Sequence, residues 1–227
     1  MLAADVRLHI TGTTLSDRFR GIPYPGTFML NRQGRVTSRF FEDYFRERNT
    51  VANLLLKLGA GGAQVQGTQI STNHLTLKTY PTDSSVALGN RFSLVLEIAP
   101  GPEMHVYAPG AANYRVITLA ITPQPFVRVL PVQYPSSEIY LFKPLKERVP
   151  VYRKPFRLVQ EIVPEVTAEA QAAFRGKQNL TIAGTLEYQA CDETVCYNPV
   201  SVPLSWTLAL HPLEVPTPAA APPAAPR

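Results

Sequence analysis

The sequence predicts a mainly β protein whose principal domain is an antiparallel β-sandwich. Its 227 residues include 22 prolines and 10 each of Tyr and Phe, with few helical repeats, which favours strands joined by proline-bearing loops. The hydrophobic fraction of 45% is ample for a packed core. From about residue 66 to residue 210, strand-like runs alternate with turns rich in Pro, Gly, Asn and Ser, a spacing typical of a sandwich.

The first predicted elements are a β-hairpin and a helix, within residues 20–59. The segment RGIPYPGTFML supplies turn residues and then the first, apolar strand. The turn NRQG follows, and RVTSRFF forms the second strand. In RNTVANLLLKLG, Asn49 or Thr50 is the expected N-cap, and Gly59 is the expected stop. We expect this helix to cover the hairpin.

Residues 59–66 open the glycine-rich stretch GAGGAQVQGTQ, which predicts a flexible linker between residues 1–58 and a second domain at 67–210. The strands expected in that domain are LTLKTY, RFSLVLEIA, YRVITLAI, FVRVLPV, VYRKPFRLVQEIV, LTIAGTLEYQAC and VSVPLSWTLAL. A short helix is expected at 168–175, capped by Thr167 and stopped at Gly176. The Pro- and Ala-rich residues 211–227 are expected to be disordered.

Composition excludes several classes of function. The net charge is +5, but the basic residues are scattered among acidic ones, so the sequence argues against nucleic-acid binding. Prolines and charges interrupt each apolar stretch before it reaches the length of a membrane span. The first residues, MLAADVRLHI, lack a basic segment followed by a long apolar core, so we expect no export signal in this chain.

The two cysteines lie in EYQACDETVCYNPV, with Asp192 to Val195 between them. These four residues are expected to form the loop of a hairpin, with Cys191 and Cys196 facing each other across its neck. Residues opposite one another on antiparallel strands have Cα atoms about 4.5–5.5 Å apart, which is within disulfide range. A reversible disulfide therefore requires little backbone movement.

Several roles for this pair remain open from the residues alone. A stabilising disulfide across so short a loop contributes only about 2 kcal/mol. A zinc site is disfavoured because the two cysteines and the four histidines show no ligand-pair spacing, and we expect no metal and no cofactor. A cysteine nucleophile of the protease type lacks a defined histidine partner, because His105 is interpreted as a strand or loop residue. Thiol–disulfide exchange is the remaining role.

The segment GIPYPGTFMLNRQGRVTSRFFEDYFRERNT resembles the closing part of a peroxiredoxin-like (AhpC/TSA) redoxin domain of the thioredoxin fold. By this resemblance Pro25 matches the family's cis-proline, although a turn proline at the start of a strand is the alternative. The cysteine motif of a redoxin lies upstream of this segment, and no cysteine precedes Cys191. Residues 1–58 are thus expected to be a partial redoxin segment without peroxidase activity, which packs on the following domain, dimerises or remains loosely ordered.

A second resemblance covers about residues 67–210. GTLEYQACDETVCYNPVSVPLSW, together with MHVYAPG, NYRVITLAI and PVYRKPFRL, resembles the N-terminal periplasmic domain of the DsbD thiol:disulfide interchange proteins. The resemblance implies an immunoglobulin-like sandwich whose redox pair is Cys191 and Cys196, with thioredoxin-like proteins as electron donor and acceptor. It also implies a periplasmic location. The alternative is a noncatalytic protein-binding sandwich with a structural hairpin disulfide.

The resemblance also implies roles around the cysteines. Cys196 is the expected nucleophile and Cys191 the resolving cysteine, and the like charges of Asp192 and Glu193 should disfavour a Cys191 thiolate, unless they only form a solvated loop. A cap loop is expected in EIYLFKPLKERVPVY, with Phe142 or Tyr140 over the sulfurs, although core packing is the alternative for Phe142. Further candidates for lining the site, which otherwise pack within strands, are Tyr107, Tyr114, Tyr188 and Tyr197.

Overall fold

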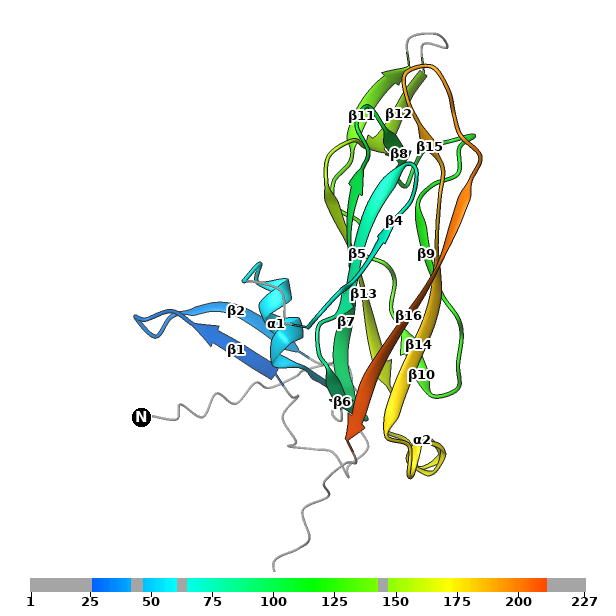
Figure 1. The fold of residues 1–227 in the computed structure, drawn as a ribbon. Helices are drawn as coiled ribbons and strands as arrows, with labels where there is room; N and C mark the ends of the chain where they lie inside the picture. The colour runs from blue at the N-terminus through cyan, green and yellow to red at the C-terminus, as the bar shows by residue number, and fades with distance from the viewer. Residues whose placement is uncertain (1–25, 42–46, 61–64, 143–146, 212–227) are drawn as a thin grey trace, which may run out of the picture.

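The computed structural model describes residues 26–41, 47–60, 65–142 and 147–211. Pro25 and residues 212–227 therefore lie outside the described residues, as do the central residues of the predicted linker. The described chain forms a mainly β, immunoglobulin-like antiparallel sandwich, and a hairpin and a short helix lie beside it (Figure 1). The predicted fold class is confirmed.

Two sheets form the body of the sandwich. The first has the strand order β10 (Val127–Val129), β13 (Phe156–Pro164), β7 (Asn90–Pro100), β5 (Leu75–Pro81) and β4 (Thr68–Ser71). The second has the order β6 (Ser85–Ala87), β16 (Val200–His211), β14 (Asn179–Tyr188) and β9 (Thr118–Ile121). Neighbouring strands in these two orders pair antiparallel, except that β6 pairs parallel with β16. The first sheet also includes the short strand β3 (Arg48–Asn49), which pairs parallel with β7.

The core lies between these two sheets because their strands alternate in polarity. Every second residue of β16, from Val202 to Leu210, is buried, and its neighbours are exposed. The core side chains that are less than 2% exposed include Phe92, Leu94 and Leu96 of β7 and Ile182 and Leu186 of β14. Trp206 crosses the interior and donates a hydrogen bond from Nε1 to Oγ1 of Thr79 in the opposite sheet, at 2.9 Å.

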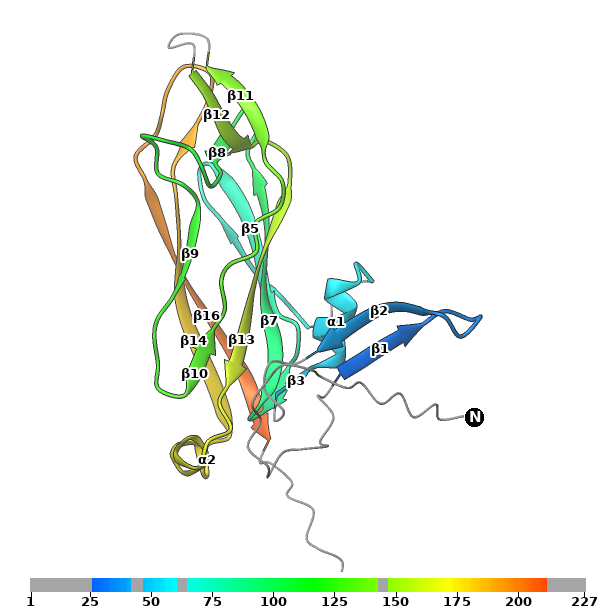
Figure 2. The ribbon, with the colours of Figure 1, turned by 180° about the vertical axis from the view of Figure 1, so that it is seen from behind.

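A third sheet lies at one end of the sandwich, in the order β11 (Glu138–Phe142), β12 (Glu147–Tyr152), β8 (His105–Tyr107) and β15 (Ala190–Cys191) (Figures 1 and 2). The predicted strand through LTIAGTLEYQAC breaks at Gln189, so that β14 and β15 belong to different sheets. The predicted strand through VYRKPFRLVQEIV also breaks, at 153–155, because Pro155 has no backbone N–H and restricts the residue before it.

Helix α2 (Ala168–Phe174) confirms the predicted short helix. Oγ1 of Thr167 accepts the Ala170 amide at 3.1 Å as the N-cap, and Gly176 follows with a φ of +76°. The helix buries Ala170 and Phe174 in the core at the opposite end of the sandwich from the third sheet (Figure 1).

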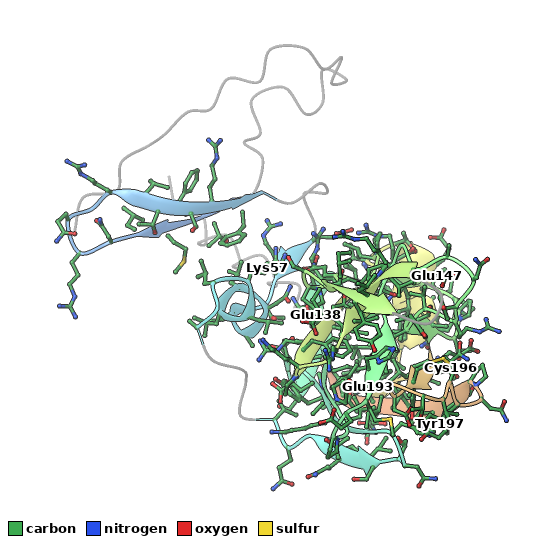
Figure 3. All side chains as sticks on the ribbon, turned by 90° about the horizontal axis from the view of Figure 1, so that it is seen from above. Lys57, Glu138, Glu147, Glu193, Cys196 and Tyr197 are labelled. Carbon is green, nitrogen blue, oxygen red and sulfur yellow. A yellow bond between two sulfur atoms is a disulfide. The ribbon has the colours of Figure 1, made fainter. Side chains whose placement is uncertain are left out.

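The predicted hairpin is present as β1 (Gly26–Leu30) and β2 (Val36–Phe41). Its turn closes with a 2.9 Å hydrogen bond from the Asn31 amide to the Arg35 carbonyl, and Gly34 has a φ of +74° that other residues rarely adopt. The hairpin extends away from the sandwich, with α1 between them (Figure 3).

Residues 47–57 pack on the sandwich. The two-residue strand β3 (Arg48–Asn49) pairs parallel with the start of β7, and α1 (Val51–Lys57) follows with Thr50 as its N-cap. Asn53 of α1 is fully buried and contacts Ser93 of β7 and Glu161 of β13. We expected the helix to cover the hairpin, but its buried side lies on the sandwich, because the outer face of β7 offers polar partners for Asn53.

Candidate functional site

One face of the third sheet carries Cys191 and the side chains that line up with it across the strands. Residues directly opposite one another on neighbouring strands share a face of the sheet. Tyr140 lies opposite Val149, Val151 lies opposite Tyr107, and His105 lies opposite Cys191. Because residues two apart on one strand also share a face, this surface runs from the edge strand β11 to Cys191.

The predicted four-residue loop joins Cys191 to Cys196, and the two cysteines form an antiparallel bridge closed by a disulfide. The Asp192 amide donates to the Val195 carbonyl, and the Tyr197 amide donates to the Ala190 carbonyl, both at 2.9 Å. These bonds flank the cysteines and make them a non-hydrogen-bonded pair, the kind whose side chains lie closest. Their Cα atoms are accordingly only 4.1 Å apart.

The two sulfur-bearing residues differ in their access to solvent. Cys191 is 1% exposed and packs with Tyr107, Val149 and Val151, whereas Cys196 is exposed. Cys196 lies at the end of the sandwich beside Tyr197, on the side away from α1 (Figure 3). An incoming thiol or disulfide therefore meets Cys196 first.

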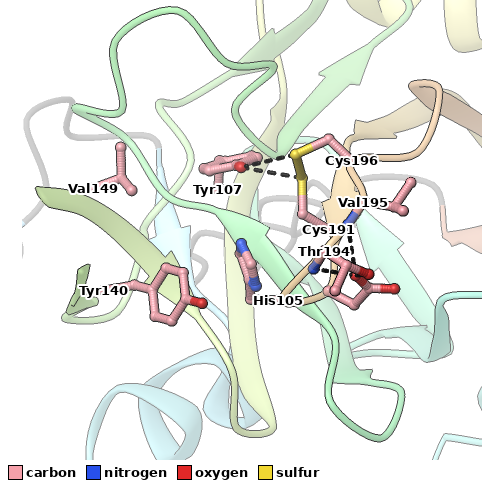
Figure 4. Close-up of a pocket in the computed structure, with 9 residues that line it drawn as sticks. His105, Tyr107, Tyr140, Val149, Cys191, Thr194, Val195 and Cys196 are labelled. Carbon is pink, nitrogen blue, oxygen red and sulfur yellow. Dashed lines mark hydrogen bonds between the residues drawn. A yellow bond between two sulfur atoms is a disulfide. The ribbon is translucent and has the colours of Figure 1, made fainter. Parts of the chain in front are cut away.

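Tyr107 contacts both sulfurs (Figure 4). Its hydroxyl lies 3.0 Å from Sγ of Cys191 and 3.4 Å from Sγ of Cys196. A disulfide sulfur carries no hydrogen, so the hydroxyl is the donor in both contacts. Burial raises the pKa of Tyr107 well above its ordinary value, and nearby Tyr114, Tyr140 and Glu147 raise it further. The hydroxyl consequently keeps its proton at neutral pH.

The ring of Tyr107 packs against the ring of Tyr114. Tyr114 stacks on it with ring centroids 4.1 Å apart, and the Tyr114 hydroxyl donates to Oε2 of Glu147 at 2.7 Å. This hydrogen bond raises the pKa of Tyr114. Glu147 belongs to β12, so the arm of the β11–β12 hairpin is linked to the aromatic pair beside the disulfide.

His105 fills the space between Tyr107 and Tyr140. Its ring centroid lies 5.5 Å from that of Tyr107 and 4.8 Å from that of Tyr140. Burial lowers the pKa of His105, the positive charge of Arg153 lowers it further, and the charge of Asp192 opposes both effects. His105 is therefore neutral at pH 7.

These side chains enclose a small hollow of about 20 Å³ beside the disulfide (Figure 4). It is lined by His105, Tyr107, Tyr140, Val149, Cys191, Asp192, Thr194, Val195 and Cys196. The predicted cap segment is a β-hairpin, β11–β12, rather than an irregular loop, and its Tyr140 lines the hollow. Phe142 ends β11, and its side chain lies outside the described part of the structure.

The remaining predicted site residues lie in different surroundings. Tyr188 is buried in the main core, where its hydroxyl lies 2.8 Å from Oγ1 of Thr72, and it does not line the hollow. The Tyr197 hydroxyl donates to Oδ2 of Asp192 at 2.9 Å. Glu193 is exposed in the loop.

Sequence reasoning missed four residues that line the hollow, namely His105, Val149, Thr194 and Val195. The alternation in HVY was a usable signal for His105, because a residue two positions from Tyr107 on one strand shares its face. The register of β8 against β15, which places His105 opposite Cys191, is a tertiary feature.

No group of three or more His, Cys, Asp or Glu side chains is placed to hold a metal ion within the described ranges. Among the helices of those same ranges, none is long and apolar enough to cross a membrane.

The described chain is therefore a β-sandwich with a disulfide in a short loop, and an aromatic side chain of the β11–β12 hairpin lies beside that disulfide. Residues 77–203 match the family described as thiol:disulfide interchange protein DsbD, N-terminal. The match covers more than half of the chain, and the chain belongs to this family.

Among solved structures, the chain is similar to the N-terminal periplasmic domain of ScsB from Proteus mirabilis, at 15% sequence identity and a TM-score of 0.43. The similarity covers 62% of this chain and 49% of that one, so the chain spans about half the length of the structure it matches. No curated protein matches the chain.

Proposed function

We propose that this protein is a thiol–disulfide exchange module, which passes electrons between thioredoxin-like partners through Cys191 and Cys196. The observation that carries the proposal is the asymmetry of the disulfide: the sulfur of Cys191 is buried against Tyr107, and Cys196 is exposed. Family membership supports the same chemistry. A disulfide that served only as a staple would not require one exposed cysteine and one buried cysteine.

The proposed reaction begins when a thiolate of the reduced donor attacks Sγ of Cys196. A bond forms between the donor sulfur and Cys196, the Cys191–Cys196 bond breaks, and Cys191 leaves as a thiolate. The donor's second thiolate then attacks the mixed disulfide, so that the donor is oxidised and both cysteines of this domain are reduced. In the second half, the Cys196 thiolate attacks the acceptor's disulfide, and Cys191 resolves the mixed disulfide.

Tyr107 assists the step in which Cys191 leaves. Its protonated hydroxyl is already 3.0 Å from Sγ of Cys191 and donates to the negative charge as it develops on that sulfur. The leaving thiolate is formed in a buried position, where desolvation alone would disfavour the charge.

The β11–β12 hairpin is the proposed cap. Tyr140 lines the hollow beside the disulfide, and the cation of Arg153 lies 5.3 Å from the centroid of its ring. In this proposal the hairpin moves aside when a partner docks over the hollow beside the disulfide. We assign Tyr140 as the cap residue, since it is the one among the described side chains of β11 that lines the hollow.

The remaining assignments rest on resemblance. The proposed location is the periplasm, which family membership supports and with which a disulfide is compatible, since disulfides persist in oxidising compartments. The interpretation of residues 1–58 as a partial redoxin segment stays a prediction, as do the division at residues 59–66 and the role of Pro25.

Trapping of the mixed disulfide tests the proposal. With Cys191→Ala, the free Cys196 should form a covalent complex with an oxidised thioredoxin-like protein, seen by nonreducing electrophoresis and mass spectrometry. With Cys196→Ala, the yield should fall at least about tenfold, because Cys191 is buried. If neither variant captures the thioredoxin-like protein, exchange is not the function and the binding-domain alternative takes its place.

The redox midpoint gives a second criterion. We expect a midpoint of about −180 to −230 mV in graded glutathione buffers, as for exchange catalysts. A midpoint below about −300 mV would identify a structural disulfide. Alkylation of free thiols followed by mass spectrometry of the 191–196 peptide measures the fraction reduced.

A further inference from the structure

The carboxylate of Asp192 organises the loop that joins the two cysteines. Its Oδ1 accepts hydrogen bonds from the Thr194 amide at 2.7 Å, the Val195 amide at 2.7 Å and the Thr194 hydroxyl at 2.8 Å. Its Oδ2 accepts the Tyr197 hydroxyl at 2.9 Å. One side chain therefore ties together the residues on both sides of Cys196.

This arrangement favours the ionised carboxylate. The hydrogen bonds from Thr194, Val195 and Tyr197 hold the pKa of Asp192 well below its ordinary value. The hydrogen bond between Tyr197 and Asp192 also raises the pKa of Tyr197, because the tyrosine hydroxyl donates to a negative charge. Asp192 is thus ionised at neutral pH, and the loop keeps an acceptor for all four donors.

Tyr197 connects the loop to the body of the sandwich. Its ring lies against His74, in the turn between β4 and β5, with centroids 4.6 Å apart. Its carbonyl accepts a hydrogen bond from Nε2 of Gln189 at 3.1 Å. The Asp192 carboxylate is in this way linked through Tyr197 to the turn before β5 and to the break between β14 and β15.

We infer that Asp192 is a positioning residue for exchange: it holds the loop so that Cys196 is presented to partners and Cys191 stays beneath it, near Tyr107. The inference rests on the proposed function and deepens it. The sequence suggested only charge repulsion on Cys191 or a solvated loop. The four hydrogen bonds indicate a geometric role, which keeps the two thiols close together after reduction and so favours reclosure of the disulfide.

Reduced glutathione provides a probe whose chemistry is defined. One glutathione thiolate attacks Sγ of Cys196, the Cys191–Cys196 bond breaks, and a mixed disulfide forms on Cys196. A second glutathione thiolate releases Cys196 and yields oxidised glutathione, and both protein thiolates take up protons. The equilibrium constant for this reduction measures how strongly the loop favours the closed disulfide. The cysteine that carries the mixed disulfide with glutathione is the one that is accessible to an incoming thiol.

Asp192→Ala should shift this equilibrium about tenfold toward the reduced protein, since the loop loses its shared acceptor. It should also lower the preference of glutathione for Cys196 over Cys191, measured by peptide mapping after acid quenching. The matched control is Glu193→Gln, which removes the same charge from a neighbouring residue. Within the described chain that carboxylate makes no hydrogen bond, and both quantities should stay within about twofold of wild type.

Asp192→Asn keeps an oxygen acceptor and should restore most of the preference for Cys196. Thr194→Val keeps the side-chain volume, removes one donor, and should shift the equilibrium in the same direction by a smaller factor. This variant keeps the inference testable if Asp192→Ala fails to fold. Equal shifts of the glutathione equilibrium in Asp192→Ala and Glu193→Gln would mean that charge alone acts. An unchanged equilibrium in both Asp192→Ala and Thr194→Val would overturn the inference.

The proposed function and the positioning role fail in different measurements. If neither Cys191→Ala nor Cys196→Ala captures a thioredoxin-like partner but Asp192→Ala still shifts the glutathione equilibrium, the function is wrong and the role of Asp192 stands. If the partner is captured and both quantities are unchanged in Asp192→Ala, the function stands and the positioning role is wrong.

Discussion

At the scale of single residues, the environment of the disulfide combines one hydroxyl donor, one neutral histidine and several aromatic rings. Tyr107 is 3% exposed and donates to both sulfurs, and His105 lies beside it. The cysteines were identifiable from the sequence, as was Tyr107 as a candidate. The side chains that bury Cys191 and leave Cys196 exposed were not identifiable, because that difference depends on how β8 and β12 pack around the loop.

Replacement of Tyr107 by Phe should slow reduction of the disulfide about tenfold, because the departing Cys191 thiolate loses a hydrogen-bond donor. The rate is measured by stopped-flow reduction with dithiothreitol. Tyr114→Phe is the control, since that hydroxyl contacts Glu147 and not the sulfurs. Equal rates in the Tyr107→Phe variant and wild type would contradict the role of the hydroxyl.

His105 should make the protein less stable in mild acid. Its folded-state pKa lies below the ordinary value of about 6.5, so the unfolded chain binds its proton first as the pH falls. The stability that the neutral ring contributes is present above that ordinary value and is lost as the pH falls below it. The decrease in Tm between pH 7.5 and pH 5 should be smaller in His105→Gln, and an unchanged pH profile would refute the assignment.

At the scale of elements, strand-like runs separated by turn residues predicted the long strands well. β5, β7, β14 and β16 all lie within or close to the predicted runs. The short strands β4, β6, β8 and β11 were not predicted, since three to five residues carry too little alternation to be distinguished from loops.

Residues 47–57 depart most from expectation, because a polar network attaches them to the sandwich. Glu47 is buried and forms ion pairs with the buried Arg91 and with Arg128, whose side chain is exposed. Asn53 donates to Oε1 of Glu161 at 3.0 Å and accepts from the Ser93 hydroxyl at 2.6 Å. An asparagine within a leucine-rich helix gives no sequence signal for burial.

Asn53→Leu should destabilise the protein by about 1–3 kcal/mol, because the Ser93 hydroxyl loses its buried acceptor and Glu161 loses a donor. Urea unfolding followed by circular dichroism measures the change as a shift in midpoint at constant slope. Val51→Ala, at a side chain that is 73% exposed on the same helix, should change stability by less than about 0.5 kcal/mol. A loss as small as that of the control would mean that α1 does not stabilise the sandwich.

At the scale of the whole molecule, the redox site and the main core are at separate places. The core lies between the two large sheets, and Cys191 belongs to β15, the edge strand of the third sheet, which lies at one end of the sandwich (Figure 1). The disulfide closes a loop of four residues and joins no distant parts of the chain. The fold should therefore not depend on it.

The double variant Cys191→Ser and Cys196→Ser should retain its β-sheet circular dichroism and a cooperative transition. Its free energy of unfolding should fall by about 2 kcal/mol, the value that chain entropy assigns to so short a loop. Differential scanning calorimetry of the variant beside wild type makes the measurement. A variant that is unfolded at 25 °C would instead favour the structural-staple alternative.

The sequence by itself determined the β-sandwich, its long strands, its second helix and the loop that brings the cysteines together. All of these depend on local spacing: alternation, caps, turn residues and the number of residues between Cys191 and Cys196. Only the tertiary structure decided which sulfur is buried, which tyrosine donates to it and where α1 packs. Those outcomes depend on the register between segments far apart in the chain, such as β8 against β15 and α1 against β7, which no local pattern specifies.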